Sequence, residues 1–207
     1  MSACLLAQTL SPEQARSASR EDQMLAFKIA RATIQREAGN NISLPKIPAN
    51  SILNRPAPVF ITIMYNNRRT GCVGSFQPQS RTLAEAIAAT AVKAWRQDTR
   101  TRPLTLSQLE SARLIIAIPG QRQRVTSTLG YPPDRYGIQL TSGRRTAVIL
   151  PEEARTSNWA LREARRLAGI SPDTPAQLQV FQAALWREPA RQPQAAKGPA
   201  ERSFAGQ

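Results

Sequence analysis

Two patterns of hydrophobic positions run along the chain, one with the period of a strand and one with the period of a helix. Residues 59–65 are mostly β-branched or aromatic, which is typical of a strand. Asn66 and Asn67 tolerate positive φ and predict a tight turn into a returning strand over 69–76. A second hairpin is predicted over 136–150, where a Ser-Gly turn separates two apolar runs.

Helix starts are marked by side chains that cap the first free backbone amides. Such residues stand at Ser11, Ser19, Thr82 and Thr156 or Ser157. The clearest helical pattern covers 84–95, where six apolar side chains fall on one stripe. Gly39 and Gly169 are placed to end the helices over 19–38 and 157–168.

The remaining patterns complete the expected fold class. A proline-marked start near residue 174 predicts a last helix, with Leu178, Phe181 and Leu185 on one face. An apolar run over 114–118 predicts a buried strand. Because hairpins and helices mix without a βαβ rhythm, we expect an α+β fold with an antiparallel or mixed sheet flanked by helices.

Composition excludes several classes of protein. The 207 residues suffice for one large domain or two small ones sharing a core. No apolar run approaches the roughly 20 residues of a membrane helix, and the first residues lack the pattern of a secretory signal, so we expect a cytoplasmic protein with no membrane association. The chain has no histidine and two cysteines, Cys4 and Cys72, which excludes histidine-dependent catalysis and a disulfide framework. We expect no metal and no cofactor, since phosphate-binding glycine loops are also missing from the sequence.

The net charge of +14 raises the question of an anionic partner. Arginine dominates the 28 basic residues, and the positive excess is concentrated in the middle of the chain. Arginine pairs well with phosphate, so weak, non-specific nucleic-acid binding is one hypothesis. Arginines scattered over a solvated surface are the alternative, and the low aromatic content of 5% lacks the stacking residues of single-strand binders.

Cys72 is the one reactive group surrounded by small residues. Gly71 and Gly74 flank it on the predicted strand and would allow a ligand or another backbone to approach closely. Arg69 and its neighbour Arg68 would favour a thiolate, with Asp98 or Glu152 required as the proton-transfer partner in place of histidine. Three roles stay open for Cys72: a nucleophile, part of a binding site, or a small buried apolar residue.

Two further groups of residues invite a functional interpretation. Arg144 and Arg145 at the tip of the second hairpin, with Arg122 and Arg124 in a predicted loop, form a candidate anion site or a solvated polar turn. Trp95 and Trp159 lie on apolar helical faces, so we expect both in the core.

Several motifs then occur in a familiar order. The sequence Pro-Val-Phe-Ile-Thr-Ile at 58–63, followed by Gly-Cys-Val-Gly-Ser-Phe at 71–76, resembles the "G-V-F-V-T-L … R-G-C-I-G-S-F" opening of the AMMECR-one domain family. That family takes its name from the Alport syndrome, midface hypoplasia and elliptocytosis chromosomal region. Residues 98–105 resemble its "D-P-R-F-x-P-L-T" step and residues 148–154 its "G-L-L-L-P-Q-V-A" step. The resemblance covers roughly residues 24–188, with departures at Thr70, Thr99, Thr101 and Glu152.

The resemblance implies two intimately packed subdomains and suggests where a site would lie. It implies a cleft beside Cys72 that binds a small molecule or a protein partner, and these residues would form it: Arg69, Gly71, Gly74, Asp98, Arg100, Leu150 and Pro151. Family members occur beside Memo-like and radical SAM proteins, which are therefore the suggested partners. A cysteine-dependent enzyme of a modification or redox pathway, with Cys72 as catalytic residue, is the second hypothesis.

The ends of the chain are expected to lie outside the domain. We expect an N-terminal extension over 1–18, an AMMECR-type domain over 19–188 and a disordered tail over 189–207. The tail is rich in proline, alanine and glutamine and has Phe204 as its single large apolar residue, so it lacks the buried area that would repay ordering.

Overall fold

The computed structural model of the chain describes residues 9–96, 98 and 102–189, and their fold is α+β, as the sequence predicts. The helices are α2 (Pro12–Arg16), α3 (Arg20–Glu37), the 3-10 helix η1 (Ile52–Asn54), α4 (Leu83–Arg96), α5 (Leu106–Ser111) and α6 (Ser157–Ala168). The strands are β1 (Phe60–Tyr65), β2 (Arg68–Gly74), β3 (Arg113–Pro119), β4 (Gln123–Val125), β5 (Gly137–Ser142), β6 (Arg145–Ile149), β7 (Gln177–Phe181) and β8 (Ala183–Arg187).

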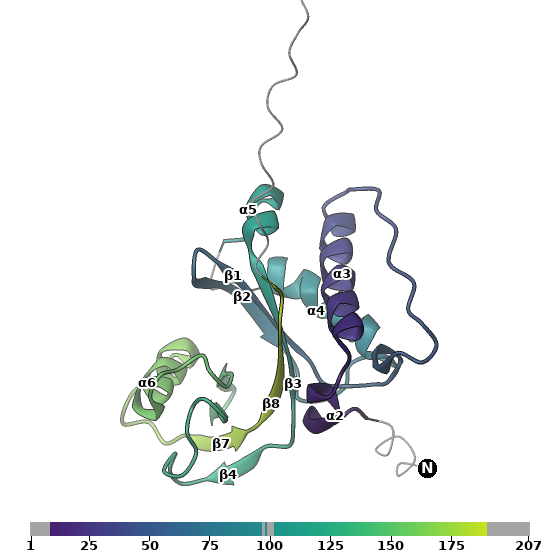
Figure 1. Cartoon of the computed structure of the whole chain (residues 1–207). Coiled ribbons are helices and arrows are strands. Elements are labelled where there is room, and N and C mark those ends of the chain that lie inside the picture. Colours follow the sequence, from purple (N-terminus) through teal and green to yellow (C-terminus); the bar gives the residue numbers. More distant parts are fainter. Residues whose placement is uncertain (1–8, 97, 99–101, 190–207) are drawn as a thin grey trace, which may run out of the picture.

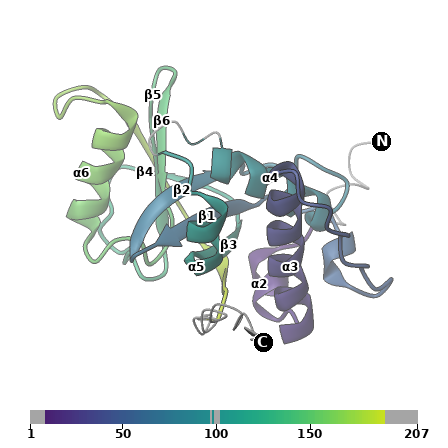
Figure 2. The same ribbon diagram turned by 90° about the horizontal axis from the view of Figure 1, so that it is seen from above.

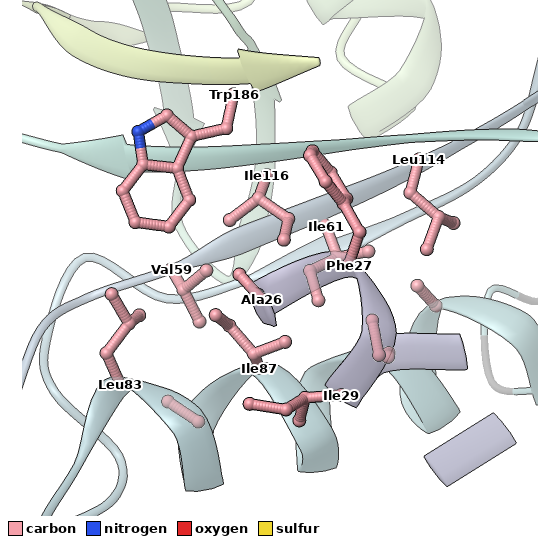
Figure 3. Packing of buried hydrophobic residues seen from close by; sticks show 14 of the residues in the cluster. Ala26, Phe27, Ile29, Val59, Ile61, Leu83, Ile87, Leu114, Ile116 and Trp186 are labelled. Atoms are coloured by element: carbon pink, nitrogen blue, oxygen red, sulfur yellow. The ribbon is translucent and has the colours of Figure 1, made fainter. Parts of the chain in front are cut away.

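The first sheet is antiparallel, in the order β2-β1-β3-β8, and α3 and α4 cover one of its faces (Figure 1). Side chains alternate along a strand, so Ile61 on β1 and Ile116 on β3 point to the same face as Trp186 on β8. Figure 3 shows them packed with Phe27 of α3 and Ile87 of α4. The opposite face of this sheet is not covered by α3 and α4, and it packs against the second half of the chain.

The second sheet is also antiparallel, in the order β4-β7-β5-β6, and α6 packs on it. Ile138, Leu140 and Val180 point toward the buried Ala160 and Ala164 of the helix. The small alanines allow α6 to lie close to the strands. Thr156 caps its first turn and Gly169, at φ 65°, ends it, as the sequence predicts.

The segment after Pro175 corrects the sequence-based expectation, because it forms β7 and β8 and not a last helix. Gln182 alone separates the two strands, and the chain passes there from the second sheet to the first. Leu178 is buried in the second sheet, whereas Phe181 belongs to a cluster between the sheets. Leu178 and Phe181 are spaced like residues on one face of a helix. In the structure they are buried in two different places, because the segment passes from the second sheet to the first.

A small apolar cluster joins the two sheets. The Phe76 ring meets Phe60 at 5.0 Å and Phe181 at 4.8 Å between centroids, both edge to face. Leu150, after β6, is buried in the same cluster. Figure 2 shows the result from above, with α6 and the second sheet on one side of the first sheet and α3 and α4 on the other. Among the described residues no helix is long and apolar enough to cross a membrane.

A buried ion pair fastens the end of β8 to α3. The Arg31 guanidinium donates to both carboxylate oxygens of Glu188 at 2.6 Å, and also to the carbonyl oxygens of Leu109 and Ala112. Glu188 in turn accepts from the Leu114 amide at 3.1 Å. The pair is thus surrounded by hydrogen bonds, as buried charges require.

Candidate functional site

A row of four residues crosses the first sheet on the face turned away from α3 and α4. Cys72, Thr62, Ile115 and Arg187 stand next to one another on β2, β1, β3 and β8. The Thr62 hydroxyl donates to Cys72 Sγ at 3.2 Å. The antiparallel register alone therefore brings the motif cysteine and the end of the described chain onto one surface.

This surface forms one wall of a cleft of about 610 Å³. Met64, Ile115 and Leu185 give this wall an apolar middle. The segment Ile149–Glu153 lies along the cleft, and α6 contributes Trp159, Glu163 and Arg166 from the other side. The cleft is thus built from segments far apart in the sequence, and its volume lies in the range of small-molecule sites.

Cys72 lies beside this cleft and packs in the apolar cluster between the sheets. Its partly buried side chain contacts the cluster that contains Phe60, Leu150 and Phe181. Among the described residues that line the cleft, Thr62 and Leu150 are its neighbours, whereas Cys72 is not itself part of the lining. The observed environment is that of a packed thiol next to a cleft.

The glycines around Cys72 are required by close backbone contacts. A Cβ on Gly71 would lie 2.2 Å from the Ala94 carbonyl oxygen of α4, and one on Gly74 would lie 2.5 Å from Phe60 Cα. The buried Asp98, just after α4, accepts a hydrogen bond from the Cys72 amide at 2.8 Å. Because β2 is an edge strand, this carboxylate satisfies an amide on its open side.

Arg69 joins β2 to the turn that follows β6. Its guanidinium lies 3.1 Å from Glu153 Oε2, and the same oxygen accepts from the Leu150 amide at 3.0 Å. Glu152, between Pro151 and Glu153, has a φ of 66° and forms an ion pair with Arg187 of β8. Both ion pairs cross from the first sheet to this turn and hold it at the side of the cleft.

Charges also reach across the cleft to α6. Arg166 donates to Glu163 at 2.6 Å and 2.7 Å, and this bond holds the pKa of the Glu163 carboxyl below its usual value. Burial opposes the shift, while the positive charges of Arg166 and of Arg69 on β2 add to it. Arg69 on β2 and Glu163 on α6 thus interact from opposite walls of the cleft.

The structure distributes the expected site residues over two places. Arg69, Leu150 and Pro151 line the cleft. Asp98 lies with Gly71 and Gly74 around the backbone of Cys72, where they position β2. Arg100, Cys4 and the segment 190–207 lie outside the described residues.

Trp159 corrects an expectation and extends the site. It was expected in the core, yet 42% of its surface is exposed, and it lines the cleft. Trp95 is partly buried against the core and donates from Nε1 to the Leu104 carbonyl at 2.7 Å. The spacing of Trp159, Glu163 and Arg166, at i, i+4 and i+7, was the available signal for a cleft-facing side of α6.

The arginines expected to form one anion site near the second hairpin contact different groups of the protein. Arg145 donates to the Gly169 carbonyl oxygen, and Arg124, which lies on β4 and not in a loop, donates to Gln177. Arg122 donates to Gln139 and stacks over the Phe76 ring at 4.6 Å. In the part of the chain that the structure describes, no group of three acidic or thiol side chains is arranged to hold a metal.

Comparisons with known proteins agree with this architecture. The model of the AMMECR1 family matches residues 27–186. A protein of Methanocella arvoryzae is 30% identical over 169 residues, which cover 75% of this chain and 83% of the relative. A protein of Methanosarcina acetivorans is 26% identical over 79% of this chain and 90% of its own. The crystal structure of an uncharacterized protein from Pyrococcus horikoshii has a TM-score of 0.66 and 18% identity over 84% of this chain and 94% of its own, which supports the fold.

Proposed function

The chain belongs to the AMMECR1 family, and on this premise we propose that its cleft binds a small molecule beside the Gly-Cys-Val-Gly motif, in the cytoplasm. The observation that carries the proposal is the 610 Å³ cleft between the first sheet and α6, with an apolar middle and charged sides. Sites of this kind bury apolar parts of a ligand and orient it through a few polar groups. The motif supports the site by shaping β2, through Gly71 and through the bond of the Cys72 amide to Asp98, and not by lining the cleft.

A fragment screen by ligand-observed NMR, repeated on two variants, tests the proposal. Ile115→Phe fills the apolar middle of the cleft and is expected to abolish binding of the fragments that the natural chain retains. Thr146→Phe adds the same side chain on an exposed strand position outside the cleft and is expected to keep them. The proposal fails if Ile115→Phe, folded by circular dichroism, retains every fragment.

A cysteine-dependent enzyme has less support, because the thiol packs in an apolar cluster and the Asp98 carboxylate faces the backbone amide of Cys72. Alkylation of a Cys4→Ser variant by iodoacetamide at pH 7 separates the two roles. Limited access predicts a rate below that of free glutathione. A faster rate would point to an activated nucleophile.

Macromolecular partners stay part of the proposal by family analogy. A Memo-like or radical SAM protein is the expected protein partner, and co-purification from cells that express both chains tests it. For nucleic acid we expect weak, non-specific binding that disappears with salt, because the attraction would come from the overall charge of +14. A sequence-selective complex of nanomolar affinity would contradict that expectation.

A further inference from the structure

One wall of the cleft presents an aromatic ring to solvent. Trp159 begins the side of α6 that faces the cleft, and its exposed fraction of 42% contrasts with the buried Ala160 and Ala164 on the neighbouring face. Leaving a large aromatic ring exposed forfeits the free energy that its burial would contribute. An exposed ring in a cleft is therefore available to stack against a flat part of a ligand.

The charges along the cleft favour an anion over a cation. Each of the three lining carboxylates already has an arginine: Glu153 has Arg69, Glu163 has Arg166, and Glu152 has Arg187. A cationic ligand would meet carboxylates whose charge is already balanced by an arginine. An anion could instead add to guanidinium groups that keep unused donors.

In the part of the lining that the structure describes, Arg68 is a fourth guanidinium beside three carboxylates. It is exposed, directly follows the Asn66-Asn67 turn, and among the described residues no ion-pair partner is found for it. The guanidinium is planar and always charged, so it suits a carboxylate or a phosphate. Among its described residues, the lining thus combines the unpaired cation of Arg68 with the exposed ring of Trp159.

We propose that the ligand of the cleft is a small molecule that carries both a planar ring and an anionic group, and this inference rests on the proposed function. The ring stacks on Trp159 above the apolar middle formed by Met64, Ile115 and Leu185. The anionic group pairs with Arg68. The cleft of about 610 Å³ is large enough for a molecule the size of a mononucleotide.

Two matched sets of probes test the ligand class by isothermal titration calorimetry. The first set is adenosine 5′-monophosphate, adenosine, which lacks the anionic group, and ribose 5-phosphate, which lacks the planar base. The second set is 2-naphthoate, 2-naphthamide and cyclohexanecarboxylate. In at least one set, the ring-bearing anion is expected to bind about tenfold more tightly than either of its counterparts, since a charge-assisted hydrogen bond and an aromatic stack each contribute about that factor.

Variants then assign the binding to the two residues. Arg68→Gln and Trp159→Leu are each expected to raise the Kd of the preferred anion about tenfold. The matched controls are Arg144→Gln, which removes an exposed arginine from the tip of the other hairpin, and Arg162→Gln, on the exposed side of α6. Both controls are expected to leave the Kd unchanged.

The outcomes separate this inference from the proposed function. If fragments bind in the cleft but neither aromatic anion exceeds its neutral counterpart and its counterpart without the planar ring, the ligand class is wrong while the binding cleft stands. Equal loss of affinity in Arg68→Gln and Arg144→Gln would also overturn the inference, because a general effect of charge would then explain it. If filling the cleft at Ile115 leaves all fragment binding intact, the proposed function itself fails.

Discussion

At the scale of single residues, the buried charges of Arg31 and Glu188 stabilise each other through their ion pair. Arg31→Met would leave the Glu188 carboxylate buried without its partner. We expect the free energy of unfolding to fall by about 3–5 kcal/mol, or roughly 10 °C in the melting temperature. Thermal unfolding followed by circular dichroism measures the change.

The control for this prediction lies on the same helix. Arg36→Met, at an exposed position of α3, is expected to change the free energy of unfolding by at most about 0.5 kcal/mol. A double variant with Arg31→Met and Glu188→Met should regain much of the loss, since it leaves no charge unpaired. A single Arg31→Met variant as stable as the natural chain would contradict the prediction.

The glycine before Cys72 carries a second prediction at this scale. Gly71→Ala would place a methyl group against the Ala94 carbonyl oxygen, a backbone atom that cannot move by a side-chain rotation. We expect a loss of about 2 kcal/mol or more in the free energy of unfolding, measured by urea titration. Cys72→Ala, one residue along the strand, should cost only about 1 kcal/mol because it removes a single partly buried atom. Equal costs for the two changes would argue against the close contact of β2 with α4.

At the scale of elements, Arg69 of β2 acts electrostatically on Glu163 of α6 across the cleft. Arg166→Gln is expected to raise the pKa of Glu163 toward its ordinary value, because the hydrogen bond from Arg166 is the largest cause of the lowered pKa. Arg69→Gln on β2 should raise it by less, and Arg162→Gln on the same helix should leave it unchanged. A carbon-13 NMR titration of the Glu163 carboxyl gives the three values.

The same pair predicts how stability depends on pH. The pKa of Glu163 is lower in the folded chain than in the unfolded chain, so the unfolded chain takes up this proton first as the pH falls. The contribution of the pair is therefore complete above the ordinary glutamate range and is lost as the pH falls through the lowered pKa. The difference in stability between the natural chain and Arg166→Gln should vanish there.

For the pKa measurement itself, an Arg69→Gln variant with an unchanged Glu163 pKa would contradict the interaction between the two walls of the cleft.

At the scale of the whole molecule, local patterns predicted the elements better than the site. The hairpin at Asn66 and Asn67 and the helix between Thr156 and Gly169 depend on short-range chemistry, and both were predicted. Leu178 and Phe181 were misassigned because their burial depends on two different sheets, which no local period reports.

The candidate site depended even more on long-range pairing. Arg69 and Pro151 were expected near one another through the family motifs, and both line the cleft. The roles of Arg187, Glu163 and Trp159 follow from strand order and from the side of α6 that turns toward the first sheet. The positions of these three residues are set by packing between elements. They could not be predicted from the type of each residue or from its neighbours in the sequence.

The most direct test of the account is a nitrogen-15 NMR map of ligand contact. Adding the tightest ring-bearing anion to the labelled full chain should shift the Trp159 indole signal together with the amides of Arg68, Ile115 and Glu153, which line the cleft from different elements. The hollow between Phe76, Arg122 and Gln179 lies elsewhere on the molecule and should stay unaffected. Shifts concentrated at that second hollow, with the Trp159 indole unmoved, would contradict the claim that the cleft beside the Gly-Cys-Val-Gly motif is the binding site.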